Sequence, residues 1–280
     1  MSILGNPITL GGGGSKVPDY TYTGNAEWYN EEKTILKLKT SGVLTLTKNC
    51  TSDVFCVGGG GAGNYPSNSS SNNEGSGGGG GGYTFTARVN FAKNSNYQAI
   101  IGAGGARMTT RGTQAPSGGT TSINGVSANG GAGGRYNTSP FRSYGGNGGS
   151  GGAGGGGGLY YGGKFVPNPN GGTDGTDGES FATQSTYGQG GSGQGTTTRA
   201  FGESSGQTFA GGGGGSGYSQ SVASKRGGTG GGYIGGLGSG SDSGNGTDGI
   251  DNTGGGGGGA IYDGTYSGAG GSGVILIRFA

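Results

Sequence analysis

Alternation of apolar and polar residues predicts several β-strands in the first half of this chain. Residues 36–39 and 43–47 alternate on either side of a Thr-Ser-Gly turn, which predicts a β-hairpin with Gly42 at positive φ. Residues 53–57 continue directly into a glycine run, and residues 84–91 form the next predicted strand. In that strand every second residue is apolar, which places Phe85, Ala87, Val89 and Phe91 on one predicted face.

Three further segments complete the predicted strands. Residues 98–101 are a short candidate, and residues 121–127 contain an Asn-Gly pair that predicts a hairpin turn. The chain closes on the apolar residues 274–279. We expect this last strand to return to the amino-terminal sheet, because an exposed apolar edge of that length would promote aggregation.

Glycine runs fill most of the chain between these strands, and glycine accounts for 83 of the 280 residues. Glycine loses more conformational entropy on ordering than any other residue, so a folded chain of this composition needs the absence of side chains at many positions. Close approach of one backbone to another is such a need. The densest runs are 58–61, 77–82, 154–158, 211–215 and 254–259.

Three kinds of structure compete for this composition. A collagen triple helix is excluded, because the chain has only 7 Pro and its glycine runs keep no triplet period. A disordered chain is disfavoured, because disordered proteins are poor in aromatic residues and this chain has 15 Tyr and 9 Phe. The third is a bundle of polyproline-II-type helices, which satisfy one another's backbone groups where no Cβ stands between them. Residues 77–82 then form an interior helix, and interrupted runs such as 145–152 suit an outer layer.

The predicted fold is therefore mainly β plus irregular structure. It consists of a β-sheet region joined to a packed bundle of polyglycine-II helices, with almost no α-helix. Residues 1–19 form a lead or attachment segment, and residues 20–128 form a β-rich region that includes the first glycine runs. Residues 129–280 form the glycine-rich region with its loops, from which strand 274–279 returns to the sheet.

Charge and the amino terminus restrict the function. The net charge is only +2 and the Lys and Arg residues are scattered, which argues against a nucleic-acid partner. No apolar stretch is long enough for a signal peptide or a membrane span. We therefore expect a protein that is made in the cytoplasm and does not insert into a membrane.

Catalytic motifs are absent from the sequence. The chain has no His, which excludes Ser-His-Asp and Cys-His arrangements. Its Gly163-Lys164 pair is followed by Phe165 rather than by the Ser or Thr of a phosphate-binding loop. We therefore predict that the protein is not an enzyme and holds no cofactor.

Cysteines and carboxylates do not predict a metal site. Cys50 and Cys56 lack His partners and the C-x-x-C spacing, and we favour free, buried thiols over a disulfide. Acidic residues cluster at 174–179 and at 242–251. The second cluster is spaced loosely like a calcium loop but lacks its final Glu, so solvated turns are favoured and calcium binding there is left open.

Residues 41–46, 55–63 and 268–279 resemble the glycine-rich domain of bacteriophage and prophage tail proteins, and the resemblance covers the chain from about residue 34 to its end. The glycine runs are also similar to those of tail-fibre tip adhesins of some T-even-like phages, in which packed polyglycine-II helices present loops to a bacterial receptor. The resemblance implies a receptor-binding protein at the virion tail tip, made in the host cytoplasm and released by lysis. Its implied partners are a bacterial surface glycan or outer-membrane protein and other phage tail proteins. Attachment to a fibre and assembly into a homo-oligomer are left open.

Aromatic residues between the glycine runs are the candidate binding residues. They lie among Ser, Asn, Gly and Thr, a composition typical of binding loops, in which rigid rings supply contact area and small residues supply hydrogen bonds. The alternative is that these rings cap or cover the bundle. The candidates are Tyr136, Phe141, Tyr144, Tyr160, Tyr161, Phe165, Tyr187, Phe201, Tyr218 and Tyr233.

Two other functions fit the composition. A structural, self-assembling extracellular filament would pair the open edges of glycine layers between chains. Ice binding would require a flat face of Thr and Ala, which the bulky Tyr and Phe residues disfavour.

Overall fold

The computed structural model describes residues 17–65, 77–138, 141–144, 199–217, 226–227, 234, 244–260 and 266–279. Within these ranges the only helix is the short 3-10 helix η1 (Ala200–Gly202). The predicted mainly β fold with almost no helix is therefore confirmed. The strands are β1 (Tyr20–Tyr22), β2 (Ala26–Trp28), β3 (Ile35–Leu38), β4 (Gly42–Leu46), β5 (Cys50–Val57), β6 (Thr84–Phe91), β7 (Asn96–Ala99), β8 (Thr121–Ile123), β9 (Val126–Ala128), β10 (Arg135–Thr138), β11 (Phe141–Tyr144), β12 (Ser216–Gly217), β13 (Arg226–Gly227) and β14 (Val274–Phe279).

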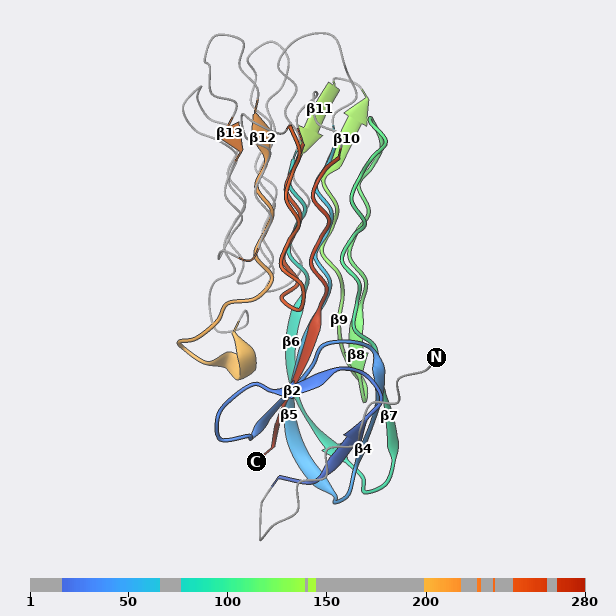
Figure 1. Ribbon diagram of the computed structural model, residues 1–280, viewed down its shortest axis with the longest axis vertical. Coiled ribbons are helices and arrows are strands. Elements are labelled where there is room, and N and C mark those ends of the chain that lie inside the picture. Colours follow the sequence, from blue (N-terminus) through green and yellow to red (C-terminus); the bar gives the residue numbers. More distant parts are fainter. Residues whose placement is uncertain are drawn as a thin grey trace.

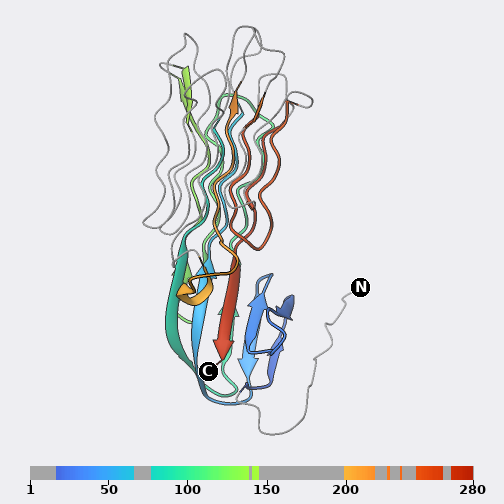
Figure 2. The same ribbon diagram turned by 90° about the vertical axis from the view of Figure 1, so that its left-hand side faces the viewer.

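The described residues form an elongated molecule with two different ends. The larger β-sheets lie at one end, and glycine runs extend from them side by side (Figure 1, Figure 2). Strands β10 to β13 lie at the opposite end of these runs. We call the end with the larger sheets proximal and the end with β10 to β13 distal.

Two sheets form a sandwich at the proximal end. One has the strand order β2-β3-β14-β5-β6 and the other β1-β4-β7, and an isolated bridge joins β8 to the chain that follows β7. Both sheets and the β8-β9 hairpin contribute buried side chains to one core. The carboxy-terminal strand β14 lies in the centre of the larger sheet, antiparallel to β3 and β5. The predicted return of residues 274–279 to the amino-terminal sheet is confirmed.

The predicted hairpin of residues 36–47 is wrong, although both of its strands exist. β3 pairs with β2 and β14 in the larger sheet, whereas β4 pairs with β1 and β7 in the smaller one. Leu38 and Leu44 therefore reach the same core from two different sheets. Gly42 is not among the glycines at positive φ in the described chain. A Cβ on Gly42 would lie 2.6 Å from the backbone nitrogen of Gly24, so this glycine allows a close crossing of two segments.

The other predicted strands are present. Residues 53–57 belong to β5, residues 98–101 overlap the end of β7, and residues 121–127 form the β8-β9 hairpin. The turn of that hairpin has Asn124 at φ 47° and Gly125 at φ 78°, as an Asn-Gly turn requires.

The faces predicted for residues 84–91 hold for part of β6. Ala87 and Val89 pack against the core and Phe91 is buried in it. Phe85 differs, because its side chain is 52% exposed. Alternation determines the side of the sheet on which a residue lies, whereas burial depends on what covers that position.

Hydrogen bonds join the glycine runs with a period of three residues. In run 58–64, every third N–H group donates to the same neighbouring run, and the three rows of donors reach three different runs. All of these bonds are 2.9–3.0 Å long. The pairs are Gly58, Gly61 and Asn64 with the carbonyls of Tyr83, Gly80 and Gly77; Gly59 and Ala62 with those of Gly119 and Pro116; and Gly60 and Gly63 with those of Gly271 and Gly268.

The carbonyl groups of run 58–64 accept hydrogen bonds from three more runs, at Gly105, 131–134 and 257–260. The six neighbours are also bonded to one another in a closed ring. Run 58–64 thus lies at the centre of a hexagonal arrangement, and its N–H groups are satisfied by backbone carbonyls. Around this centre the runs follow the order 77–83, 129–134, 115–120, 102–108, 266–273 and 253–260.

This arrangement requires the absence of side chains. A Cβ on Gly60, Gly61 or Gly79 would lie 2.0–2.1 Å from a carbonyl oxygen of a neighbouring run. That distance is far inside the roughly 3.5–4.0 Å of favourable contact between non-bonded atoms. Residues 77–82 are buried throughout, as expected of an interior run, whereas residues 145–152 lie outside the described residues.

Both cysteines lie on β5 and have free thiols. Cys56 is buried and Cys50 is half-buried. Six residues along an extended strand span roughly 20 Å, which is beyond the reach of a disulfide. The predicted free thiols are confirmed, but only Cys56 is fully buried.

Candidate functional site

The distal end carries the hairpin of β10 and β11 and the short pair of β12 and β13 (Figure 1). Run 129–134 leads directly into β10, so its hydrogen bonds to neighbouring runs determine where the hairpin leaves the glycine region. Three predicted binding residues, Tyr136, Phe141 and Tyr144, belong to this one hairpin. Six others lie outside the described residues: Tyr160, Tyr161, Phe165, Tyr187, Tyr218 and Tyr233.

Helix η1, which contains Phe201, lies at the proximal end, away from the β10-β11 hairpin (Figure 1). It belongs to segment 199–210, which packs on one face of the larger sheet, and we call this the covering segment. The Phe201 ring centre lies 6.3 Å from that of Phe55, and the Arg278 guanidinium lies 4.4 Å from the Phe201 ring centre. The structure therefore does not bring Phe201 together with the candidates of the distal hairpin.

An ion-pair cluster joins the covering segment to the sheet. Arg278 on β14 contacts Asp53 on β5 at 2.9 Å and Glu203 of the covering segment at 3.5 Å. Arg88 on β6 approaches the same Asp53 carboxylate at 3.8 Å. These side chains are partly exposed, so the pairs add modestly to a contact that apolar burial dominates.

Two stacks of arginine on tyrosine lie at the distal ends of described glycine runs. The Arg107 guanidinium lies 4.6 Å from the ring centre of Tyr266, and its Nη2 lies 2.7 Å from Oδ2 of Asp248. The Arg111 guanidinium lies 4.9 Å from the ring centre of Tyr65. Cation–π contacts of this kind orient the arginine and stabilise it by about 0.5–1 kcal/mol at exposed sites. The distal ends of these runs therefore carry oriented guanidinium groups.

Met108 lies between these two arginines in sequence and anchors their segment. It is buried with Tyr65 in a small cluster whose other members are Ala62, Ala115 and Ala260. The Met108 N–H donates to Oγ of Ser267 at 3.0 Å, and the Met108 carbonyl accepts the Ser267 N–H at 3.0 Å. This double contact holds the end of run 102–108 against run 266–273.

These distal residues are not among the binding residues predicted from the sequence. An aromatic signal was present, because Tyr65 and Tyr266 adjoin glycine-rich segments in the same way as the chosen tyrosines. Arg107 and Arg111 carried no signal, because scattered arginines are typical of a solvated surface. Their stacking on the tyrosines depends on contacts between separate runs.

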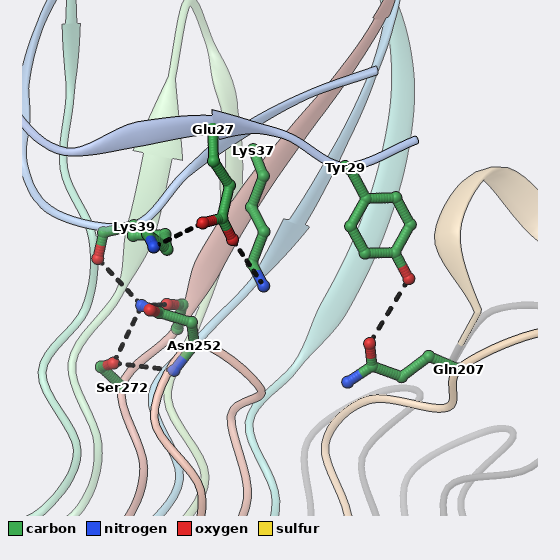
Figure 3. A network of polar contacts seen from close by, with 8 residues as sticks. Glu27, Tyr29, Lys37, Lys39, Gln207, Asn252 and Ser272 are labelled. Carbon is green, nitrogen blue, oxygen red and sulfur yellow. Dashed lines mark hydrogen bonds and ion pairs between the residues drawn. The ribbon is translucent and has the colours of Figure 1, made fainter. Parts of the chain in front are cut away.

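Asn252 joins the glycine region to the proximal sheets (Figure 3). Its side-chain amide donates to the carbonyl oxygens of Lys39 at 2.8 Å and Gly273 at 3.2 Å, and its backbone N–H donates to Oγ of Ser272 at 2.9 Å. Its φ of 58° is left-handed, a conformation that Asn adopts more readily than most other residues. One residue thus connects three segments where the two regions meet.

Polar side chains of β2 and β3 lie beside this junction (Figure 3). Glu27 lies between Lys39, at 2.6 Å, and Lys37, at 3.5 Å. The hydrogen bond from Lys39 is the main cause that lowers the pKa of Glu27. Nearby, the Tyr29 hydroxyl donates to Oε1 of Gln207 at 3.4 Å, and burial raises the pKa of Tyr29. These contacts connect an edge of the larger sheet to the covering segment.

Comparison with known families agrees with the glycine-based architecture. Residues 39–280 match the family described as glycine-rich domain. The chain belongs to the glycine-rich domain family. No curated protein matches this glycine-rich domain protein in sequence. In the described part of the chain, no helix has the length and hydropathy needed to cross a bilayer.

Two residues of the acidic cluster at 242–251 act as hydrogen-bond acceptors in the structure. Oδ1 of Asp248 accepts the Ala269 N–H at 2.7 Å, and Oδ1 of Asp251 accepts the Ser272 N–H at 3.0 Å. Both side chains are exposed, as the favoured interpretation of solvated turns predicts, and each also binds a backbone N–H group of another run. No group of three His, Cys, Asp or Glu side chains suited to a metal ion occurs among the described residues.

An open hollow of about 490 Å³ lies between the strands of the sandwich. It is lined by the start of β5, the end of β6 and Tyr97 of β7. Several of its polar groups already bind one another: Thr51 donates to Oδ1 of Asn90 at 2.6 Å, and the Tyr97 hydroxyl accepts the Ala92 N–H at 2.6 Å. The glycine-rich domain therefore has a second, weaker candidate surface on its β-rich part.

Proposed function

We propose that the glycine-rich domain is a polyglycine-II bundle, and that the protein is a receptor-binding adhesin of a bacteriophage tail. The bundle positions the loops that contact the receptor. The observation that carries the proposal is the aromatic β10-β11 hairpin at the distal end of a hydrogen-bonded run.

The three-residue hydrogen-bond period supports the polyglycine-II conformation. A polyproline-II-type helix has three residues per turn and no internal hydrogen bonds, so it directs its N–H groups in three directions. Run 58–64 bonds in this way to three neighbours. A β-strand lies between two hydrogen-bonded neighbours and repeats every two residues, which would not produce this pattern.

The position of the aromatic hairpin supports the adhesin. Loops on a rigid scaffold commonly carry recognition, and run 129–134 is bonded to its neighbours up to Gly134, the residue before β10. Little entropy is then lost when the hairpin binds, and aromatic anchors supply most of the contact energy. Arg107 and Arg111, which stack on tyrosines at the distal ends of other runs, are further candidate hydrogen-bond donors.

The proposed adhesin works at the tip of the virion tail, after assembly in the host cytoplasm and release by lysis. Its partners are a bacterial surface glycan or outer-membrane protein at the distal end and other tail proteins at the proximal end. Recognition of the receptor requires neither catalysis nor a cofactor. The resemblance of residues 41–46, 55–63 and 268–279 to phage tail proteins supports this assignment.

Adsorption of labelled, purified protein to a panel of bacterial strains tests the proposal. We expect wild-type protein to bind a subset of strains, and the double variant Tyr136→Ala/Tyr144→Ala to lose at least roughly tenfold in affinity, because truncated aromatic anchors typically cost over 1 kcal/mol each. Phe85→Ala is the matched control, since it removes an exposed aromatic ring from the proximal sandwich. Each variant must melt like the wild type.

Two outcomes would contradict the adhesin. One is the absence of binding to every strain and to isolated envelope material. The other is full binding by the distal variant together with loss of binding by Asn90→Ala. The second result would indicate that the receptor binds in the hollow of the sandwich instead of at the distal end.

A further inference from the structure

The N–H groups of run 266–273 are all hydrogen-bonded, but in three different ways. One row, at residues 267, 270 and 273, donates to carbonyls of run 102–108 at 2.8–3.0 Å. A second row, at residues 268 and 271, donates to run 253–260 at 2.7–2.8 Å. The third row, at residues 266, 269 and 272, donates to side chains instead of backbone carbonyls.

Three side chains of one neighbouring segment accept this third row, and we call them the acceptor ladder. Oδ1 of Asn245 accepts the N–H of Tyr266 at 3.1 Å. Asp248 and Asp251 accept the next two donors of the row, at 2.7 and 3.0 Å. The acceptors and the donors are both spaced by three residues, so the ladder follows the repeat of the runs.

The acceptor ladder lies on an exposed edge of the glycine region. The Asp248 side chain is 46% exposed, and Asp251 is also exposed. Arg107 reaches Asp248 from the other side of run 266–273 and contacts its Oδ2 at 2.7 Å. The ladder and this ion pair together cover a row of backbone donors that would otherwise face solvent.

We infer that the acceptor ladder protects this edge against pairing with a second copy of the chain. A row of unsatisfied N–H groups is a template for another backbone, and proteins protect such sheet edges with charged side chains. In this molecule the N–H row belongs to a glycine run instead of a sheet edge. Two of the three side chains that cover it carry a carboxylate, as charged residues do at sheet edges.

The complementary edge of the second copy is run 102–106. Ala103 and Ala106 of this run are exposed, and Gly104 between them is partly exposed and has no side chain, so another backbone can approach at Gly104. A contact between this run and the uncovered row joins two different surfaces. Such heterologous contacts do not close on themselves unless the rotation allows it, so they produce open assemblies. Loss of the ladder is therefore expected to produce growing oligomers rather than a single dimer.

The variant Asn245→Ala/Asp248→Ala/Asp251→Ala tests the inference. Its run 244–250 keeps two backbone bonds to run 266–273, from Gly246 to Tyr266 and from Gly249 to Ala269, so it is expected to remain in place. We expect amide exchange at residues 266, 269 and 272 to accelerate at least roughly tenfold, because their bonds are lost without global unfolding. We also expect the sedimentation coefficient to rise with protein concentration.

The matched control is Asp248→Asn/Asp251→Asn, which keeps an oxygen acceptor at each position and should behave like the wild type in both measurements. Adding Ala106→Arg to the triple variant should restore the wild-type sedimentation coefficient, because it obstructs the second edge. If the triple variant does not fold, Asp248→Ala/Asp251→Ala uncovers two donors of the row and takes its place.

Accelerated exchange with an unchanged sedimentation coefficient would overturn the inference and leave the ladder a purely intramolecular role. Unchanged exchange would also overturn it, because the donors would then not depend on the ladder for cover. Association that persists after Ala106→Arg would overturn the assignment of the second edge.

Discussion

Glycine in the interior runs acts through the space that it leaves rather than through an unusual φ. Gly60 and Gly61 are not among the positive-φ residues of the described chain. A Cβ on either residue would nevertheless lie within about 2 Å of a neighbouring carbonyl oxygen. At the scale of residues, the composition therefore reflects packing between backbones.

Replacing Gly61 by Ala is expected to lower the free energy of unfolding by about 1–3 kcal/mol, the usual cost of overpacking. The added methyl would lie 2.1 Å from the Ala132 carbonyl oxygen, which is held in the ring of runs. Thermal unfolding followed by circular dichroism measures the effect. Ala106→Ser, at an exposed position of run 102–108, is the control and should change stability by less than about 0.5 kcal/mol. Equal melting temperatures for both variants would contradict the close packing.

The two cysteines should differ in reactivity. Burial raises the pKa of Cys56 to about 12, so its thiol stays protonated at pH 8 and is inaccessible as well. Iodoacetamide should therefore modify Cys50 first in the folded protein and both residues in urea, as measured by peptide mass spectrometry. Alkylation of Cys56 as fast as Cys50 in the folded protein would argue against its burial.

The raised pKa of Cys56 also makes the stability of the protein depend on pH. Its folded value of about 12 lies above the ordinary 9.0, so folding favours the neutral thiol. The stabilisation is fully present below pH 9 and is lost as the pH rises from 9 toward 12. The free energy of unfolding of the Cys56→Ala variant should therefore fall less than that of the wild type as the pH rises from 9 toward 12.

At the scale of elements, the covering segment determines what one face of the larger sheet contacts. Phe209 and Ala210 of this segment are buried against Phe55, Val57 and Leu276 of the sheet. Phe201 extends the same contact in a left-handed conformation, with φ 58°. These contacts hold the start of run 210–216 near the proximal sheets.

Phe201→Ala is expected to lower the free energy of unfolding by about 1–2 kcal/mol, less than a fully buried Phe would cost, because this ring is only half-buried. The same variant should adsorb to bacteria like the wild type once it is folded, since Phe201 lies at the proximal end. Urea unfolding and the strain-panel assay measure the two effects. Loss of adsorption with unchanged stability would indicate that Phe201 contacts the receptor, as the sequence predicted.

At the scale of the whole molecule, the run at the centre of the hexagonal arrangement is better protected from solvent than a run at its edge. Run 58–64 has bonded neighbours on all sides, whereas run 102–108 is exposed along one side. Backbone groups at the centre can reach water only when several runs separate together. The centre of the glycine region is thus expected to open with the whole fold.

Hydrogen exchange measured by NMR should follow this arrangement. The amides of Gly60 and Gly61 should exchange as slowly as those of the central strand β14, because both are bonded in the interior. The amides of Ala103 and Ala106 lie on exposed residues and should exchange many times faster. Similar rates at all four positions would contradict an ordered arrangement of runs.

Much of the fold could be predicted from local patterns. Alternation identified β6, because the side chains of a strand point to alternate faces whatever its partners, and the Asn-Gly pair identified the β8-β9 hairpin. The apolar residues 274–279 had to be covered, which predicted their return to the sheet. The abundance of glycine predicted close backbone contact, because no other residue permits it. The predicted domain boundaries stay predictions.

Other features depended on contacts between distant segments. The hairpin prediction for residues 36–47 failed because β3 and β4 do not pair with each other across the turn. They belong to two different sheets, which bury their leucines in a shared core. Phe201 and Tyr136 looked alike in sequence, yet one lies on the covering segment and the other on the distal hairpin. Asp248 is exposed, as expected from the sequence, but its contact with a backbone N–H of run 266–273 could not be predicted.

The sequence by itself determined that runs of glycine must pack against other backbones and that apolar strands must share a core. Only the tertiary structure decided which runs are neighbours, for example that Gly60 bonds to Gly271. The physical reason is that glycine runs have no side chains, so one run is locally indistinguishable from another. Their neighbours are chosen by the strands, turns and side-chain acceptors at their ends and edges.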